Sequence, residues 1–176
     1  KELTAEQPDP PKYFAMMKQV NKNGPELTTG DPVPEVDSIE TLEQAINDDQ
    51  SVVLDARAGN EFGEQHLPGS INIPFNTQFP NWVGWLLEYN KNIIVLSDEC
   101  QVNDIKISLQ SIGFDQLKGY AKPGIIDKAS KTESYGQIEP TELNQSLNAN
   151  AVHLIDVRNQ NEWNEGHISG AQHIMP

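Results

Sequence analysis

The sequence has one cysteine, few basic residues and no long apolar run. Its 176 residues include 12 Lys or Arg against 26 Asp or Glu, for a net charge of -14. One thiol excludes an internal disulfide framework and predicts a cytoplasmic location. Nucleic-acid binding is not expected, because no stripe of basic residues is present to replace counterions. The longest apolar run, Trp82 to Leu87, is too short to cross a bilayer, and no signal-peptide pattern is present.

What the chain does contain is an internal repeat. Residues 52–74 align without a gap within the stretch from His153 to the last residue, Pro176, and matched residues such as Asp55 and Asp156 are 101 positions apart. The identical pairs include Asp55 and Asp156, Arg57 and Arg158, Asn60 and Asn161, Glu61 and Glu162, His66 and His167, and Gly69 and Gly170. Identity at polar as well as apolar positions indicates a duplicated domain.

The first copy reads as strands alternating with helices. A helix is expected from Asp37, as its capping residue, to about Asn47. Apolar runs at 52–54 and 93–96 have the length of buried parallel strands. Another helix, with apolar residues at 105, 109 and 112, is expected before Gly113. This order predicts an α/β fold in which helices cover both faces of a parallel sheet.

One more helix is expected between the two strands of the first copy. Pro80 suits the first position of a helix, since its fixed φ matches and its missing N–H is not needed there. Its apolar face is predicted to consist of Trp82, Trp85 and Leu86.

The repeated pattern resembles the opening signature of the rhodanese domain, the fold of sulfurtransferases. In each copy Asp-x-Arg is followed by Glu and then by His-[Ile/Leu]-x-Gly. The resemblance implies a complete unit at 35–124 and the N-terminal part of a second at 137–176. The polar stretch 125–136 between them is expected to be a linker. The catalytic position of the second unit would lie beyond Pro176.

The rhodanese resemblance also implies a nucleophile. In that family a cysteine directly after the strand equivalent to 93–96 attacks a sulfane sulfur and carries it as a persulfide. Here Ser97 occupies that position, and a serine cannot form a persulfide. The predicted loop from Ser97 to Asn103 has no glycine or arginine, and its carboxylates, Asp98 and Glu99, would repel a sulfur anion. The complete unit is therefore expected to be inactive.

Cys100 is the remaining candidate for a catalytic residue. A rearranged loop would present it as a sulfur acceptor, whereas the alternative is an incidental loop thiol. A rhodanese-like phosphatase is disfavoured, because Lys106 stands where a Cys-x5-Arg motif needs its arginine.

The repeated polar residues are interpreted as structural. They are Asp55, Arg57, Glu61 and His66, with their copies Asp156, Arg158, Glu162 and His167. We expect the Asp and the Arg to form a charge-assisted pair at the end of the strand, and the His to hydrogen-bond a turn. No metal site is expected, since the four histidines are scattered along the chain.

Residues 1–34 differ in character from the rest. Tyr13, Met16, Met17 and Val20 fall at helical spacing. The segment resembles the closing helix of a metallo-β-lactamase-fold domain of the persulfide dioxygenase type, which some bacterial proteins carry ahead of rhodanese domains. The alternative is a helix that docks on the rhodanese unit. A start at Lys1, without methionine, suggests a fragment or a processed product.

Together these resemblances imply a parent enzyme of hydrogen sulfide detoxification. An iron-dependent dioxygenase in the preceding domain would oxidise a persulfide, and the terminal rhodanese would exchange sulfane sulfur with sulfite and thiosulfate. No cofactor is expected in this segment, and a homo-oligomer is possible for the parent. The alternatives are a noncatalytic rhodanese-like scaffold or interaction module, and an independent tandem thiosulfate sulfurtransferase.

Overall fold

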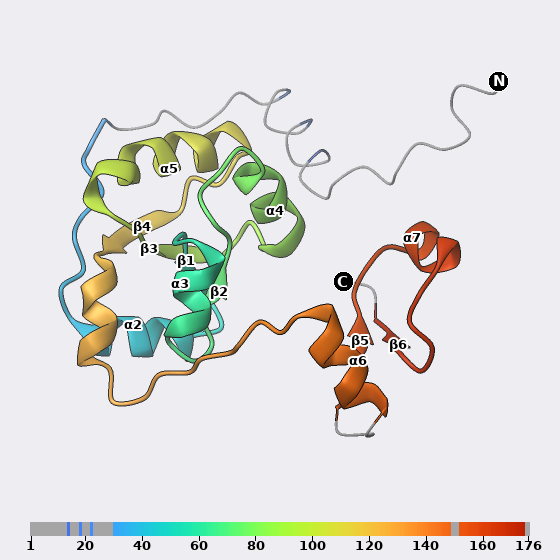
Figure 1. The fold of residues 1–176 in the computed structure, drawn as a ribbon. Coiled ribbons are helices and arrows are strands. Elements are labelled where there is room, and N and C mark those ends of the chain that lie inside the picture. The colour runs from blue at the N-terminus through green and yellow to red at the C-terminus, as the bar shows by residue number, and fades with distance from the viewer. Residues whose placement is uncertain (1–13, 15–17, 19–21, 23–29, 149–151, 175–176) are drawn as a thin grey trace. The chain divides into compact units, whose positions relative to one another are not determined.

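A computed structural model describes residues 14, 18, 22, 30–148 and 152–174 (Figure 1). The helix predicted around Tyr13 to Val20 lies outside these residues, apart from single positions. The chain divides into two compact units, Lys1–Tyr135 and Gly136–Pro176. Each unit is described by itself. None of the described helices combines the length and the apolar character of a membrane span.

The first unit is built on one parallel sheet. Its strands, in the spatial order β2-β1-β3-β4, are β1 (Ser51–Asp55), β2 (Ile71–Asn72), β3 (Asn92–Leu96) and β4 (Leu117–Ala121). The central pair is in register over its full length, with Val53 opposite Ile94 and Leu54 opposite Val95. An isolated bridge between Glu35 and Tyr120 extends the free edge of β4. The parallel sheet expected from the sequence is confirmed.

Helices cover both faces of this sheet. On one face lie α4 (Phe79–Leu86) and α5 (Glu99–Ser111), and on the other lie α2 (Ile39–Ile46) and the short 3-10 helix η2 (Pro123–Lys128) (Figure 1). Side chains alternate along a strand, so Leu54 enters the core under α4 and α5 while Val53 enters the core under α2. The remaining helix, α3 (Gly59–Glu64), connects β1 to β2.

The first helix is capped one residue later than expected. Ser38, rather than Asp37, is the capping residue of α2, and its hydroxyl accepts a hydrogen bond from the Thr41 amide at 3.3 Å. The same hydroxyl donates to Glu40 at 2.7 Å. A serine at this position satisfies one of the free amides of the first turn, as an aspartate would.

The apolar face predicted for α4 is not the face that the helix buries. The helix buries Phe79 and Val83, whereas Trp82, Trp85 and Leu86 are 53%, 40% and 48% exposed. The helix has apolar residues around most of its circumference, so either face satisfied the periodicity. Phe79 and Val83 are one helical turn apart, and both pack in the core against residues of the sheet.

The segment expected to be a linker packs on the first unit over much of its length. Ile125 and Ile126 in η2 are buried against α2. Further on, the backbones of His66 and Glu133 exchange two hydrogen bonds of 2.9 Å, and the Tyr135 amide donates to the Gly63 carbonyl at 2.8 Å. Its polar composition therefore reflects a surface segment that follows the unit and is joined to it partly by backbone hydrogen bonds.

The second unit repeats the opening of the first. Its elements are α6 (Pro140–Asn148), β5 (Ile155–Asp156), α7 (Gln160–Glu165) and β6 (Gln172–His173). Strands β5 and β6 pair in parallel, with Ile155 opposite Gln172, as Leu54 is opposite Ile71. Ile155 is 48% exposed, whereas Leu54 is fully buried. Among the described residues, no strand of this unit takes the place of β3.

We predict that Gly69→Ala destabilises the first unit by about 1 to 3 kcal/mol, because Gly69 has a φ of +86° that side chains rarely adopt. An added Cβ would also lie 2.6 Å from a methyl group of Ile46. Urea unfolding followed by circular dichroism measures the change. Gly124→Ala is the control, since its Cβ would meet nothing within 4 Å. Equal stability of the two variants would contradict the prediction.

Candidate functional site

The position that carries chemistry in folds of this kind is the carboxyl edge of the sheet. Ser97 lies there, directly after β3, and its side chain is 1% exposed. Its amide donates to the Ala121 carbonyl at 3.1 Å. Its hydroxyl is 3.2 Å from the Asp98 carbonyl oxygen and 3.3 Å from Oε1 of Gln101. Ser97 is therefore enclosed, and its hydroxyl is bonded to its own neighbours.

The prediction of a loop from Ser97 to Asn103 is wrong, because residues 99–103 are helical. Helix α5 begins at Glu99, with Asp98 as its capping residue. Two acidic residues at this end suit the partial positive charge of a helix N-terminus, and Val102 and Ile105 anchor the helix in the core. Cys100 is exposed in the first turn of α5 rather than in a loop.

Lys122 lies beside this first turn, and carboxylates surround it. Its Nζ is 3.1 Å from Glu99 and 3.1 Å from Glu35. Hydrogen bonds to Glu35 and Glu99 raise the pKa of the Lys122 ammonium. Desolvation, together with the nearby charge of Glu35, raises the pKa of Tyr120, whose hydroxyl is 3.2 Å from that carboxylate. With Asp98 also nearby in the chain, the edge offers no net positive charge to an anion.

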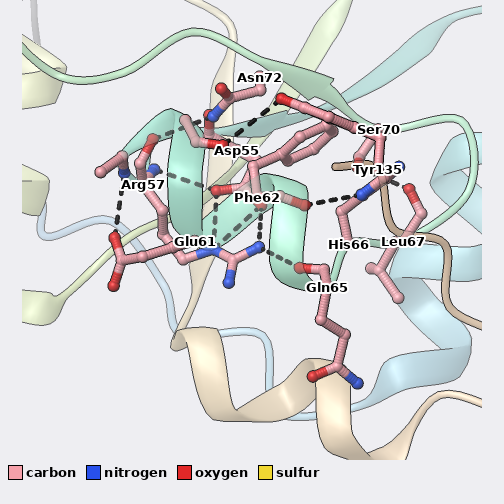
Figure 2. A network of polar contacts seen from close by, with 12 residues as sticks. Asp55, Arg57, Glu61, Phe62, Gln65, His66, Leu67, Ser70, Asn72 and Tyr135 are labelled. Carbon is pink, nitrogen blue, oxygen red and sulfur yellow. Dashed lines mark hydrogen bonds and ion pairs between the residues drawn. The ribbon is translucent and has the colours of Figure 1, made fainter. Parts of the chain in front are cut away.

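The repeated Asp and Arg form a bidentate ion pair at the end of β1 (Figure 2). Nη2 of Arg57 lies 2.6 Å from Oδ2 of Asp55, and Nε lies 3.0 Å from Oδ1. The side chains are 12% and 0% exposed. Arg57 also donates to the Gln65 carbonyl at 2.9 Å, which ties the strand end to the end of α3. Asn72 donates to the Asp55 carbonyl at 2.9 Å and so joins β2 to the same turn.

Glu61 and His66 make local contacts around α3 (Figure 2). The Glu61 carboxylate accepts from the Ala58 amide at 3.1 Å, at the start of the helix. Nδ1 of His66 lies 2.8 Å from the Phe62 carbonyl, and since that oxygen can only accept, Nδ1 carries the hydrogen. The imidazole stacks on the Phe62 ring, with centroids 4.0 Å apart. His66 thus contributes packing and a turn contact.

The second unit reproduces this network. Arg158 and Asp156 approach to 2.6 Å, and Arg158 donates to the Gly166 carbonyl at 2.9 Å. Glu162 accepts from the Asn159 amide at 3.3 Å. Nδ1 of His167 lies 3.1 Å from the Trp163 carbonyl. The pair is more open to water, since the Arg158 side chain is 44% exposed.

No metal site is visible in the part of the chain that the structure describes, where no three His, Cys, Asp or Glu side chains gather closely enough to hold an ion. Sequence reasoning missed Glu35 and Lys122, which lie 87 positions apart and meet only after folding. No local pattern marks such a pair.

A family model described as the rhodanese-like domain matches residues 38–127 and 139–176. The chain belongs to this family. The first rhodanese-like unit thus extends over η2, in agreement with the packing of that helix. No curated protein matches the chain.

Solved structures include similar proteins. A metallo-beta-lactamase from Staphylococcus aureus subsp. aureus COL is 31% identical, with a TM-score of 0.58 over 69% of this chain. The chain spans 33% of that protein's length. A variant of EanB in complex with hercynine is 13% identical, with a TM-score of 0.52 over 85% of this chain and 42% of its own. A second EanB variant, in complex with ergothioneine, is 13% identical, with a TM-score of 0.51 over 82% of this chain and 41% of its own. The likeness to EanB shows the fold alone.

Asp55→Asn should destabilise the first rhodanese-like unit by about 3 kcal/mol, because it removes one charge of a buried pair and leaves Arg57 without its counterion. Urea unfolding measures the loss. Asp127→Asn is the matched control at an exposed aspartate, and we expect it to leave the unfolding midpoint unchanged. A midpoint shared by both variants would contradict the role given to the pair.

The second rhodanese-like unit makes a prediction about pH. Hydrogen bonds from Arg158 lower the pKa of Asp156 from 3.8 to about 2. A lowered pKa stabilises the folded state above the unfolded value, and this stabilisation is lost as the pH falls through the folded pKa. We expect the Asp156 carboxyl to titrate near 2 by NMR. In Arg158→Gln the midpoint should return toward 3.8, and an unchanged midpoint would refute the assignment.

Proposed function

We propose that the first rhodanese-like unit is a noncatalytic module within a larger enzyme of sulfur metabolism. The observation that carries the proposal is the buried Ser97 at the end of β3, with α5 beginning at Glu99. Sulfur transfer needs a thiolate that attacks a sulfane sulfur and holds it as a persulfide. A hydroxyl cannot take this role, so the unit has the fold of the family without its nucleophile.

The environment of Ser97 supports the same proposal. A thiolate is favoured by a loop of backbone amides or by nearby cations. Here a helical turn with Asp98 and Glu99 follows the strand instead, and Glu99 and Glu35 bind Lys122. Restoring the cysteine alone would therefore not restore a site for thiosulfate.

For the parent protein we propose a persulfide dioxygenase joined to rhodanese domains, acting in sulfide detoxification. Support comes from the 31% identity to a Staphylococcus aureus metallo-beta-lactamase, of which this chain spans a third. Persulfide, thiosulfate and sulfite would be its small-molecule partners, in the cytoplasm. Iron would be held by the preceding metallo-β-lactamase-like domain, as the resemblance of the parent to a persulfide dioxygenase implies. Residues 137–176 would open a second rhodanese domain, and the parent could be a homo-oligomer.

A competing proposal places sulfur on Cys100. The thiol is exposed in the first turn of α5, within reach of a small persulfide donor. In that case the unit would be a sulfur acceptor with a displaced nucleophile.

We predict that Ser97→Cys, made in a Cys100→Ser background, forms no thiocyanate from thiosulfate and cyanide above the uncatalysed rate. The reason is that the substituted thiol would lie buried behind a helical turn and beside carboxylates. Turnover is followed in the full chain by colorimetric detection of thiocyanate, with an active rhodanese as the positive control. Activity in the variant would show that the surroundings of residue 97 still bind a sulfur anion.

The competing role of Cys100 has a separate test. After exposure of the wild-type chain to glutathione persulfide, intact-mass spectrometry should show no stable gain of one sulfur atom, with Cys100→Ser as the matched control. A gain in the wild type that Cys100→Ser abolishes would support Cys100 as an acceptor. It would overturn the noncatalytic assignment.

A further inference from the structure

The stretch from Asp31 to Val36, which we call the entry segment, runs along β4 before the chain enters α2 (Figure 1). The Tyr120 amide donates to the Pro34 carbonyl at 3.0 Å, and the Val36 amide donates to the Tyr120 carbonyl at 2.7 Å. Val33 and Val36 pack on opposite faces of the sheet, each against one of the two core clusters. The entry segment therefore covers the edge of β4 as a strand would.

The entry segment lies closest to β4 at Gly119. A Cβ atom added to Gly119 would lie 2.7 Å from Cγ2 of Val36 and 3.2 Å from the Pro34 carbonyl oxygen. Apart from its chain neighbours, no other residue that the structure describes has an atom within 4 Å of that position. A methyl group at position 119 would thus press on the entry segment alone.

The entry segment is tied to α5 at two points. Nζ of Lys106 donates to the Asp31 carbonyl at 2.8 Å. At the other end, the Glu35 carboxylate lies 3.1 Å from Nζ of Lys122. The same Nζ lies 3.1 Å from the carboxylate of Glu99, the first residue of α5. Lys122 thereby bridges the entry segment and the start of the helix.

The spacings of the two ties match. Asp31 and Glu35 are four residues apart, about 13 Å along an extended chain. Glu99 and Lys106 are seven residues apart, about 10 Å along a helix. The flexible lysine side chains make up the difference, so the entry segment lies beside α5 in one register. A shift by one residue would turn its side chains to the opposite faces of the sheet.

The first turn of α5 depends on the tie to Lys122. The side chain of its capping residue, Asp98, makes no capping hydrogen bond to the helix amides, all of which the structure describes. Glu99 and Cys100 are exposed, and Val102 is the first buried residue of the helix. A turn with few buried contacts opens locally at a low free energy. The ion pair of Glu99 with Lys122 therefore stabilises the closed turn, by a small amount because the pair is exposed.

We propose that Lys122 couples the entry segment to the first turn of α5, so that displacing the segment loosens this turn. A displacement of the chain ahead of Asp31 is then felt at the edge of the sheet where Ser97 lies. The coupling does not depend on whether the unit transfers sulfur. In the parent proposed above, it would make the first rhodanese-like unit responsive to the domain before it, rather than a passive spacer.

Hydrogen exchange of the full chain, followed by NMR, tests the coupling. Gly119→Ala presses on the entry segment, and Gly124→Ala is the matched control, since its Cβ would meet nothing within 4 Å. In Gly119→Ala we expect faster exchange at the Val36 amide. We also expect exchange up to about fivefold faster at the Val102 amide, which reports on the first turn of α5. Gly124→Ala should leave both rates unchanged.

A second pair of variants identifies the route. In a Lys122→Gln background, Gly119→Ala should still speed exchange at Val36 but no longer at Val102, each rate being compared with that of Lys122→Gln alone. Lys118→Gln is the matched control background, because it removes the same charge from the start of β4, and the acceleration at Val102 should persist there.

Three results would overturn the proposal. The first is faster exchange at Val36 in Gly119→Ala without any change at Val102. The second is an equal acceleration at Val102 with Lys122 present and replaced. The third is unchanged exchange at both amides, which would mean that the close approach at Gly119 does not hold the entry segment.

Discussion

The buried ion pair of Asp55 and Arg57 determines how β1 ends and how the chain continues. Asp55 is fully buried, so its charge is tolerated only because Arg57 and a backbone amide satisfy it. The arginine in turn holds the end of α3 through the Gln65 carbonyl. Asp156 and Arg158 form the same contacts in the second unit, although no described strand there takes the place of β3. The network is therefore a local device, formed by a short stretch of chain, that does not need the complete sheet.

The unit has the fold of its family, but the end of β3 does not carry the cysteine that the resemblance implies. The strand, its register with β1 and the helix that follows are present, yet the residue at the catalytic position is a buried serine. Helix α5 starts at Glu99, so a helical turn closely follows the strand, and Glu35 and Glu99 form ion pairs with the neighbouring Lys122. The buried serine and the acidic surroundings both support the noncatalytic role proposed above. In the function proposed above the unit is noncatalytic and acts through its surface, where Trp82 and Trp85 of α4 are exposed.

The elements differ in how far sequence patterns could locate them. The runs at 52–54 and 93–96 predicted β1 and β3 to within about one residue, because a central parallel strand is apolar on both faces. Asp37 and Ser38 are both good capping residues, so only the backbone geometry could choose between them. For α4 the periodicity is ambiguous, because apolar residues lie around most of the helix, and packing buries Phe79 and Val83 rather than the predicted apolar face. The composition of the surface segment after β4 predicted a linker. The bridge between Glu133 and His66 is made by backbone groups, which residue composition does not reveal.

The sequence alone determined the duplication, the order of strands and helices in the complete unit, and the absence of a cysteine at position 97. These follow from identity, periodicity and residue type, which are properties of short stretches. Tertiary structure decided the start of α5 at Glu99, the meeting of Glu35 with Lys122 and the exposure of Trp82 and Trp85. Each of these depends on segments far apart in the chain that compete for the same space in the core. Such a competition is resolved by packing, which no local pattern encodes.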